Sequence, residues 1–183
     1  MKKIETPLKG LWLIEPDVYR DERGYFFESY HERKYKELGI PVSFVQDNQS
    51  YSVYGVIRGL HYQLQPYAQA KLVRVLRGSI YDVAVDLRKG SPTFGQWYGV
   101  ELSDKNFLQL YIPHGFAHGF SVLSPEAEVL YKCDAYWNKN AERGIVYNDA
   151  FLSIDWKIPA GKELISPKDR NFPAFSKAEY NFE

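Results

Sequence analysis

Two histidines, a glutamine and a lysine stand at defined spacings in the sequence and have side chains that could do chemistry. Gln63 lies two residues after His61, Lys71 lies eight residues after Gln63, and residues 113–118 form a Pro-x-Gly-x-x-His motif that ends in His118. A neutral imidazole can bind a metal ion or remove a proton. A protonated lysine has no lone pair and would repel a metal. The set is therefore a poor site for a divalent metal, and Lys71, as a fixed cation, could instead stabilise developing negative charge on an oxygen.

Short strands must carry these residues. Gly, Pro, Asn and Asp separate short segments rich in strand-forming residues, and this pattern predicts a mostly β sandwich or barrel. The clearest strands are 71–76, 80–87, 97–102, 107–112 and 127–133. Alternation along a strand places Lys71 on the face of Val73 and Val75, and Tyr131 on the face opposite Lys132. We expect both faces to point into the interior, although a strand lysine is more often exposed.

One helix and an irregular end complete the predicted architecture. Ser29 and Glu32 have the spacing of a capping box, and Gly39 before Pro41 predicts the end of that helix. The last thirty residues are rich in Pro and Gly, so we expect them to wrap the fold irregularly with some short helix.

Composition limits the classes of function. The chain has 183 residues, which suits a single domain over residues 1–183. Lys plus Arg and Asp plus Glu are 23 each, so no global basic field favours nucleic acid. No apolar run reaches membrane-spanning length, and the charged start from Met1 to Glu5 is not a secretory signal. Cys133 is the single cysteine, expected as a small buried residue, and we expect a cytoplasmic protein.

The spacing around His61 and His118 resembles the two motifs of the cupins. In those proteins two His, a Glu and a later His bind a metal inside a β-barrel. Here Gln63 stands in place of the second His, and Lys71 stands in place of the Glu. The resemblance implies a barrel that keeps the cavity, with no metal and no other cofactor.

Along nearly its whole length the chain resembles the dTDP-4-dehydrorhamnose 3,5-epimerase family. Eight segments match in order, namely 21–29, 44–48, 58–63, 71–74, 91–95, 113–120, 130–132 and 166–169. The resemblance implies a cupin-type double-stranded β-helix, or jelly-roll barrel, with a few short helices. It also implies a cytoplasmic homodimer that acts on the nucleotide sugar dTDP-4-keto-6-deoxyglucose. We expect the segment up to Leu13 to add a strand to the sheet of the neighbouring subunit.

The same resemblance assigns four catalytic roles. Epimerisation next to a ketone passes through an enolate, so one group must remove a proton and another must return one to the opposite face. His61 occupies the position of the general base and Asp169 that of the carboxylate that fixes its tautomer. Lys71 stabilises the enolate oxygen, and Tyr131 is the proton donor. A tyrosine, with an ordinary pKa of about 10, can act as an acid here because an enolate is strongly basic.

Further positions match residues that contact the substrate in the family. Arg23 and Arg58 suit a diphosphate, because a guanidinium binds phosphate through a rigid fork of donors. Trp137 stands where the family places a tyrosine that stacks on thymine, and an indole can keep that role. The other matching positions are Glu28, Gln46, Asn48, Lys71, His118, Glu142 and Lys168.

Three alternatives stay open at this point. An epimerase that inverts C3 only, or C5 only, would share the base, the acid and the lysine. A metal-dependent cupin is disfavoured by Gln63 and Lys71, and metal analysis would identify it. A sugar-nucleotide binding module without catalysis would keep Arg23, Arg58 and Trp137 but would have no reason to keep the four catalytic residues together.

Overall fold

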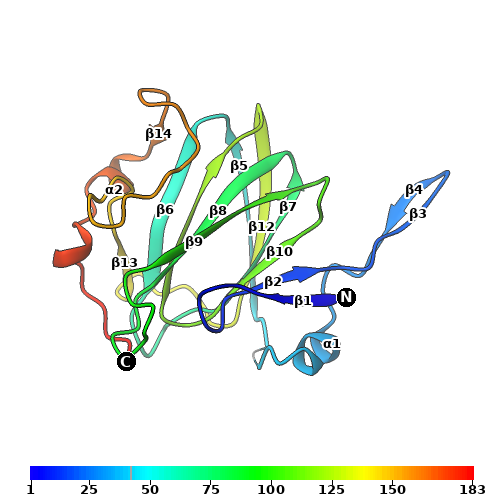
Figure 1. Ribbon diagram of the computed structural model, residues 1–183, viewed down its shortest axis with the longest axis horizontal. Helices are drawn as coiled ribbons and strands as arrows, with labels where there is room; N and C mark the ends of the chain where they lie inside the picture. Colours follow the sequence, from blue (N-terminus) through cyan, green and yellow to red (C-terminus); the bar gives the residue numbers. More distant parts are fainter. Residues whose placement is uncertain (42) are drawn as a thin grey trace.

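Two antiparallel sheets face each other and form the body of the protein. The computed structural model describes residues 1–41 and 43–183. Figure 1 shows the two sheets and, clear of them, a hairpin that extends from one side. The first sheet has the order β1 (Lys2–Glu5), β2 (Trp12–Glu15), β10 (Gln109–Ile112), β7 (Lys71–Arg77), β12 (Glu126–Cys133) and β5 (Gln46–Val53).

The second sheet has the order β13 (Glu142–Gly144), β6 (Val56–Gln63), β11 (Phe116–Val122), β8 (Ser79–Asp86) and β9 (Trp97–Ser103). A short strand, β14 (Leu164–Ile165), pairs with β6 in parallel. The mostly β prediction is therefore confirmed, and the five predicted strands agree with the structure within two residues at each end. Strand β10 begins at Gln109 rather than at Phe107, because Phe107 has a φ of 57° and cannot continue an extended strand.

Alternation along the strands explains the core between the sheets. Val73 and Val75 of β7 and Val129 of β12 are buried against residues of β8 and β11 such as Ala84 and Phe120. Burial of each such side chain stabilises the fold by about 1.5–3 kcal/mol. Lys71 shares the face of Val73, and Tyr131 packs against this core. The predicted inward faces of both strands are therefore confirmed.

The helical prediction was correct at one end and wrong at the other. Helix α1 (Glu32–Glu37) is capped by His31 without a side-chain hydrogen bond, so Ser29 and Glu32 form no capping box. The helix starts too late for the predicted box, and Oε1 of Glu32 instead accepts hydrogen bonds from Lys36 at 2.8 Å and from Ser43 at 2.5 Å. Gly39, with a φ of 89°, follows the last turn as predicted.

The C-terminal segment wraps over the outer face of the second sheet, as expected from its proline and glycine content. It contains helix α2 (Pro167–Arg170) and a single 3₁₀ turn, η1 (Phe175–Lys177). Leu152, Trp156, Phe175 and Phe182 pack on the face of the sheet that points away from the first sheet. This cover makes the second sheet apolar on both faces and places α2 beside β6.

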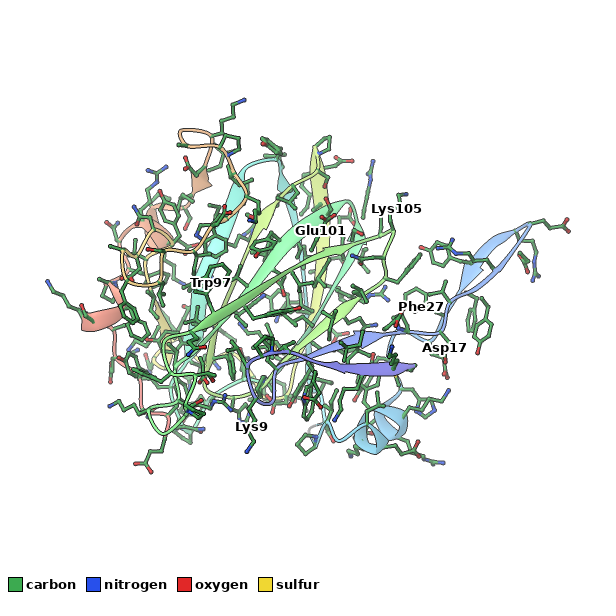
Figure 2. The ribbon with its side chains drawn as sticks, in the orientation of Figure 1. Lys9, Asp17, Phe27, Trp97, Glu101 and Lys105 are labelled. Carbon is green, nitrogen blue, oxygen red and sulfur yellow. The ribbon has the colours of Figure 1, made fainter. Side chains whose placement is uncertain are left out.

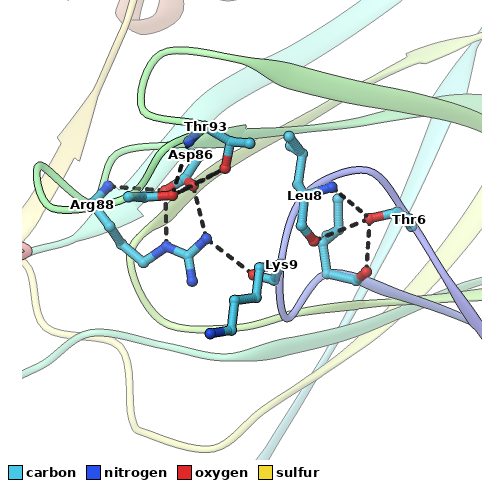
Figure 3. A network of polar contacts seen from close by, with 8 residues as sticks. Thr6, Leu8, Lys9, Asp86, Arg88 and Thr93 are labelled. Carbon is cyan, nitrogen blue, oxygen red and sulfur yellow. Dashed lines mark hydrogen bonds and ion pairs between the residues drawn. The ribbon is translucent and has the colours of Figure 1, made fainter.

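A buried carboxylate ties two loops together at the end of β8. Oxygens of Asp86 accept hydrogen bonds from Nε of Arg88 at 2.8 Å and from Oγ1 of Thr93 at 2.7 Å. Nη2 of Arg88 also donates to the carbonyl of Lys9 at 3.0 Å, which joins the β8–β9 loop to the β1–β2 loop (Figure 3). The network fixes the end of β8, and β8 in turn forms part of the barrel wall.

The extended hairpin is named the arm here and consists of β3 (Tyr19–Asp21), β4 (Gly24–Phe26) and their turn. Figures 1 and 2 show it standing clear of the two sheets, with Phe27 near its base. Tyr19, Tyr25 and Phe26 are exposed on it. Within the described residues, no helix has the length and apolar character needed to cross a membrane.

Candidate active site

A histidine and a carboxylate form the centre of the candidate site. Nε2 of His61, on β6, lies 2.8 Å from Oδ1 of Asp169, on α2. The backbone N–H of Gly59 donates to the other carboxylate oxygen at 3.1 Å. Burial by itself would raise the pKa of Asp169, but the hydrogen bonds from His61 and Gly59 outweigh it and lower the pKa. An ionised Asp169 therefore accepts the Nε2 hydrogen, and Nδ1 of His61 keeps its lone pair.

The turn of chain before α2 explains how Asp169 reaches this position. Ser166 caps the helix, and its hydroxyl oxygen accepts a hydrogen bond from the backbone N–H of Asp169 at 3.0 Å. Pro167 occupies the first helical position, where a missing N–H costs nothing. The Ser-Pro-Lys-Asp segment thus aims a buried carboxylate at β6.

An irregularity in β6 lets two of its residues face the same side. The pairing with β11 shifts register between His118 and Phe120, which are opposite His61 and Arg58 respectively. In a regular strand, residues three apart point to opposite faces. Gly59 lies within the shift, with a φ of 133°, and a Cβ there would come within 2.5 Å of Gly119 Cα. Arg58 and His61 can therefore both point between the sheets.

The first sheet supplies the opposite wall. Strand pairing aligns Lys71 with Cys133 and Asn48 with Tyr131, so these side chains share one inward face. Nζ of Lys71 lies 5.8 Å from the centre of the Tyr131 ring. Within the described part of the chain, this ammonium group makes no ion pair. Nδ2 of Asn48 lies 3.6 Å from the Cys133 sulfur.

Burial changes the acid–base properties of this wall. It lowers the pKa of Lys71, which Cys133 and the carboxylates of Asp82 and Glu142 partly oppose. It raises the pKa of Tyr131, so that group keeps its proton. Burial also raises the pKa of the Cys133 thiol. The cysteine therefore behaves as the expected small buried residue, and the wall offers a cation and a protonated phenol.

Two cavities meet at His61. One has a volume of about 240 Å³ and is lined by Gln46, Asn48, His61, Tyr62, Gln63, Gln69, Lys71, Tyr131, Trp137 and Glu142. The other has about 540 Å³ and is lined by Arg58, His61, Lys168, Asp169 and Arg170 among others. The first brings together a histidine, an ammonium group and a phenol, which are groups suited to proton transfer, and the second contains Asp169 with cations suited to phosphate. We name the two together the cleft.

The loop beside the cleft depends on Gln63. Its Nε2 donates to the carbonyl of Tyr67 at 2.7 Å, and its Oε1 accepts from the backbone N–H of Asn138 at 2.6 Å. The backbone N–H of Trp137 donates to Oε1 of Gln46 at 3.0 Å, while its indole is exposed. Gln63 is thus occupied with backbone groups, and Trp137 is presented at the mouth of the cleft.

Of the positions predicted to contact the substrate, the cleft contains Gln46, Asn48, Arg58, Lys71, Trp137, Glu142 and Lys168. Glu142 and Lys168 form an ion pair of 2.7 Å across it. His118 is buried beside it, opposite His61 in the sheet. Arg23 and Glu28 are not brought to the cleft. Arg23 lies on the arm and pairs with Asp21, and Glu28 pairs with Lys34.

Sequence reasoning missed Asp82, Tyr62 and Gln69. Asp82 is fully buried on β8 and lies 2.7 Å from Nε2 of His118. Its signal was a charged residue in the middle of an apolar strand. Among the residues that the structure describes, no three His, Cys, Asp or Glu side chains come together as a metal site would require.

The family model described as dTDP-4-dehydrorhamnose 3,5-epimerase matches residues 5–177. A protein of that name from Pseudomonas aeruginosa is 54% identical over 180 residues, with 98% of each chain covered. The crystal structure of the enzyme of that name from Elizabethkingia anophelis is 56% identical, with a TM-score of 0.92 and coverage of 96% of this chain and 97% of that one. A Legionella pneumophila 3,5-epimerase in complex with dTDP-4-keto-L-rhamnose is 51% identical, with a TM-score of 0.92 and coverage of 96% and 93%.

Proposed function

The chain belongs to the dTDP-4-dehydrorhamnose 3,5-epimerase family, and we propose that its cleft carries out the epimerisation. The catalytic residues in this proposal are His61, Asp169, Lys71 and Tyr131. The enzyme inverts C3 and C5 of dTDP-4-dehydro-6-deoxy-D-glucose and yields dTDP-4-dehydro-L-rhamnose, in dTDP-L-rhamnose biosynthesis. Its fold is the cupin-type barrel of its relatives. The observation that carries the proposal is the His61–Asp169 pair on one wall of the cleft, facing Lys71 and Tyr131 on the other.

His61 starts the reaction. Asp169 holds the Nε2 hydrogen, so Nδ1 takes the proton from the carbon next to the C4 ketone. The electrons of the broken C–H bond form a C=C bond to C4, and the C=O π electrons move to the oxygen, which becomes an enolate. The ammonium group of Lys71 donates a hydrogen bond to that oxygen. A cation in a water-poor site stabilises developing charge more strongly than the same cation in water.

Tyr131 completes the inversion. Its hydroxyl gives a proton to the same carbon from the other wall, the C=C electrons form the new C–H bond, and the C4 ketone is restored. Solvent then returns a proton to the tyrosinate and takes one from His61. Since His61 and Tyr131 stand on opposite sheets, they can address opposite faces of one sugar ring. The same two groups serve C3 and C5 in turn.

The remaining cleft residues hold the nucleotide. Arg58 donates from Nε to Oγ of Ser52 at 3.0 Å, which fixes its guanidinium beside the larger cavity. With Lys168 and Arg170 it forms a cationic wall that suits a diphosphate. The exposed indole of Trp137 offers a flat surface for thymine.

The positions of Arg23 and Glu28 support a homodimer. Both match substrate-contacting positions of the family, yet neither lines the cleft of its own chain. Arg23 lies in the turn of the arm, where it pairs with Asp21, and the arm extends clear of the two sheets (Figure 1). The arm also exposes Tyr19, Tyr25 and Phe26, which a partner could cover. In this proposal, the arm of each protomer supplies Arg23 to the partner's cleft. Strand β1, at the end of the first sheet, provides an edge for pairing with the second copy.

A mixing experiment tests this arrangement. Arg23→Ala and His61→Asn are each expected to be nearly inactive alone. If Arg23 acts in the partner's cleft, random mixing makes half of the dimers mixed, each with one intact site, and restores about one quarter of wild-type activity. No recovery after subunit exchange would reject the shared site. Light scattering that gives the 21.3 kDa mass of one chain at micromolar concentration would reject the dimer.

Two further statements belong to this proposal. Residues 1–183 act as one domain, which is supported by a family match that runs from residue 5 to residue 177. The location is cytoplasmic, which is supported by a nucleotide-linked substrate and by an unpaired, buried Cys133.

Proton NMR in heavy water tests the reaction itself. Wild-type enzyme with dTDP-4-keto-6-deoxyglucose should introduce deuterium from solvent at both C3 and C5 as the product forms. Deuterium at C3 alone would show a single epimerisation, and deuterium at neither carbon would contradict the proposed function.

A further inference from the structure

A carboxylate without an assigned role lies in the wall of the barrel. Asp82 is in the middle of β8, and its side chain is fully buried among the apolar residues of the core, near Ile80 and Ala84. Its Oδ1 lies 2.7 Å from Nε2 of His118. Its Oδ2 has no hydrogen-bond partner among the residues that the structure describes. A half-satisfied buried carboxylate costs stability, so packing does not explain its presence.

The contact determines which nitrogen of His118 carries hydrogen. Burial, with the nearby positive charge of Lys71, lowers the pKa of His118 although the Asp82 carboxylate opposes this. The ring is therefore neutral and has one N–H. An ionised carboxylate can only accept a hydrogen bond, so the hydrogen is on Nε2 and Nδ1 has a lone pair. Within the described residues, Nδ1 receives no hydrogen bond from the protein.

Asp82 also acts on the charge of Lys71. The ammonium group stands in a partly buried site, where burial lowers its pKa, and the Asp82 carboxylate is one of the charges that oppose this. The titratable groups around it come from several strands, namely Cys133 and Tyr131 of β12, Asp82 of β8, His61 of β6, His118 of β11 and Glu142 of β13. Of the carboxylates among them, Glu142 pairs with Lys168, while Asp82 has an oxygen free of hydrogen bonds.

We propose that Asp82 is a positioning residue of the epimerase: it fixes His118 in the tautomer whose Nδ1 accepts a hydrogen bond from a sugar hydroxyl. The inference rests on the proposed function, because it needs a sugar and an enolate in the cleft. It predicts two separable effects. The hydroxyl contact belongs to substrate binding and affects KM, whereas the charge of Lys71 belongs to the chemical step and affects kcat at high pH.

The first test needs no substitution. Nitrogen-15 NMR of the wild-type protein at pH 7 should show His118 neutral, with its hydrogen on Nε2. A hydrogen on Nδ1, or a doubly protonated ring, would overturn the proposal. This result does not depend on turnover, so it stands apart from the proposed function.

The second test compares Asp82→Asn with Asp86→Asn. Both substitutions remove a buried carboxylate from β8, but Asp86 serves the loop network and not the cleft. Asp82→Asn should raise KM about 10-fold and move the alkaline limb of the kcat profile to lower pH, because Lys71 loses a charge that opposes the lowering of its pKa. Asp86→Asn should lower the melting temperature, while KM stays within about twofold of wild type and the alkaline limb of the kcat profile does not move.

A purely structural Asp82 would make the two variants behave alike. Unchanged KM and an unchanged alkaline limb in folded Asp82→Asn would therefore reject the positioning role. The wild-type enzyme is assayed in the same experiment. If it introduced no deuterium at C3 or C5, the proposed function would fail. If it did, an unaltered Asp82→Asn would refute the present inference alone.

Discussion

Replacement of Lys71 by methionine should lower activity and raise stability together. Methionine has a similar length but no charge, so the variant keeps the volume and loses the cation next to the enolate oxygen. Removal of one such electrostatic group typically costs about 10²–10³ in kcat, which corresponds to about 3–4 kcal/mol of transition-state stabilisation. KM should change less, because the ketone carries little charge before the proton is removed.

The stability of the same variant should move in the opposite direction. The ammonium group of Lys71 is held where burial lowers its pKa, and within the described residues it has no ion-pair partner. An unpaired cation in such a site costs folding free energy, and an apolar side chain there does not. Discounted for the partial exposure of Lys71, the gain should be about 1–2 kcal/mol. For a chain of this size that raises Tm by about 2–8 °C.

Lys105→Met is the matched control, because the side chain of Lys105 is 89% exposed. It should leave kcat unchanged and shift stability by less than about 0.5 kcal/mol. The assay combines calorimetry without substrate and initial rates at saturating substrate. A Lys71→Met enzyme with wild-type kcat would refute the enolate role. An inactive variant that also melts well below wild type would refute the reasoning about its buried charge.

Three other outcomes are expected. Asp169→Asn should lower kcat by about 10²–10⁴ because His61 loses the carboxylate that fixes its tautomer, and nitrogen-15 NMR should show an altered His61 tautomer; a wild-type kcat would argue against this role. Burial alone would raise the pKa of Asp86, but hydrogen bonds from Arg88 and other groups lower it in the folded protein. The ionised carboxylate therefore stabilises the fold above its unfolded pKa of about 3.9, and this stabilisation is lost as the pH falls through the lower pKa of the folded state. The urea concentration at the midpoint of unfolding should therefore decrease as the pH falls below about 4. The decrease should be less steep in Asp86→Asn, and an equal dependence on pH in the two proteins would contradict this. Turnover should survive exhaustive EDTA treatment because Lys71 and Gln63 replace two metal ligands, and loss of activity that a divalent ion restores would contradict this.

Much of the site could be predicted from the sequence, because a strand alternates strictly. Because side chains alternate along a strand, Lys71 is predicted on the inward face of Val73 and Tyr131 on that of Val129. Both side chains lie on these faces in the structure. The same rule fails on β6, where Arg58 and His61 would point to opposite sides of a regular strand. The register shift at Gly59 brings them to one side, and shifts of this kind depend on how two strands pair rather than on either strand alone.

Other features depend on contacts between distant segments. The Asp82–His118 pair joins residues 36 positions apart, and a charged residue in an apolar strand does not by itself identify its partner. The sequence predicts that Gln63 does not bind a metal, but its hydrogen bond to the loop at Asn138 follows only from the folded chain. Family motifs predict Arg23 and Glu28 as substrate contacts, but a motif cannot predict that the folded chain holds both away from its own cleft.

The central claim is that His61 and Tyr131 act on opposite faces of the sugar ring, and one paired measurement tests it most directly. Deuterium incorporation and inversion at C3 and C5 are followed by proton NMR in heavy water for Tyr131→Phe and His61→Asn. Tyr131→Phe keeps the base and the cation, so exchange should persist while inversion falls about 100-fold or more. His61→Asn should lose exchange and inversion together, because no enolate forms. Inversion by Tyr131→Phe at the wild-type rate, or exchange by His61→Asn at the wild-type rate, would contradict the two-face mechanism.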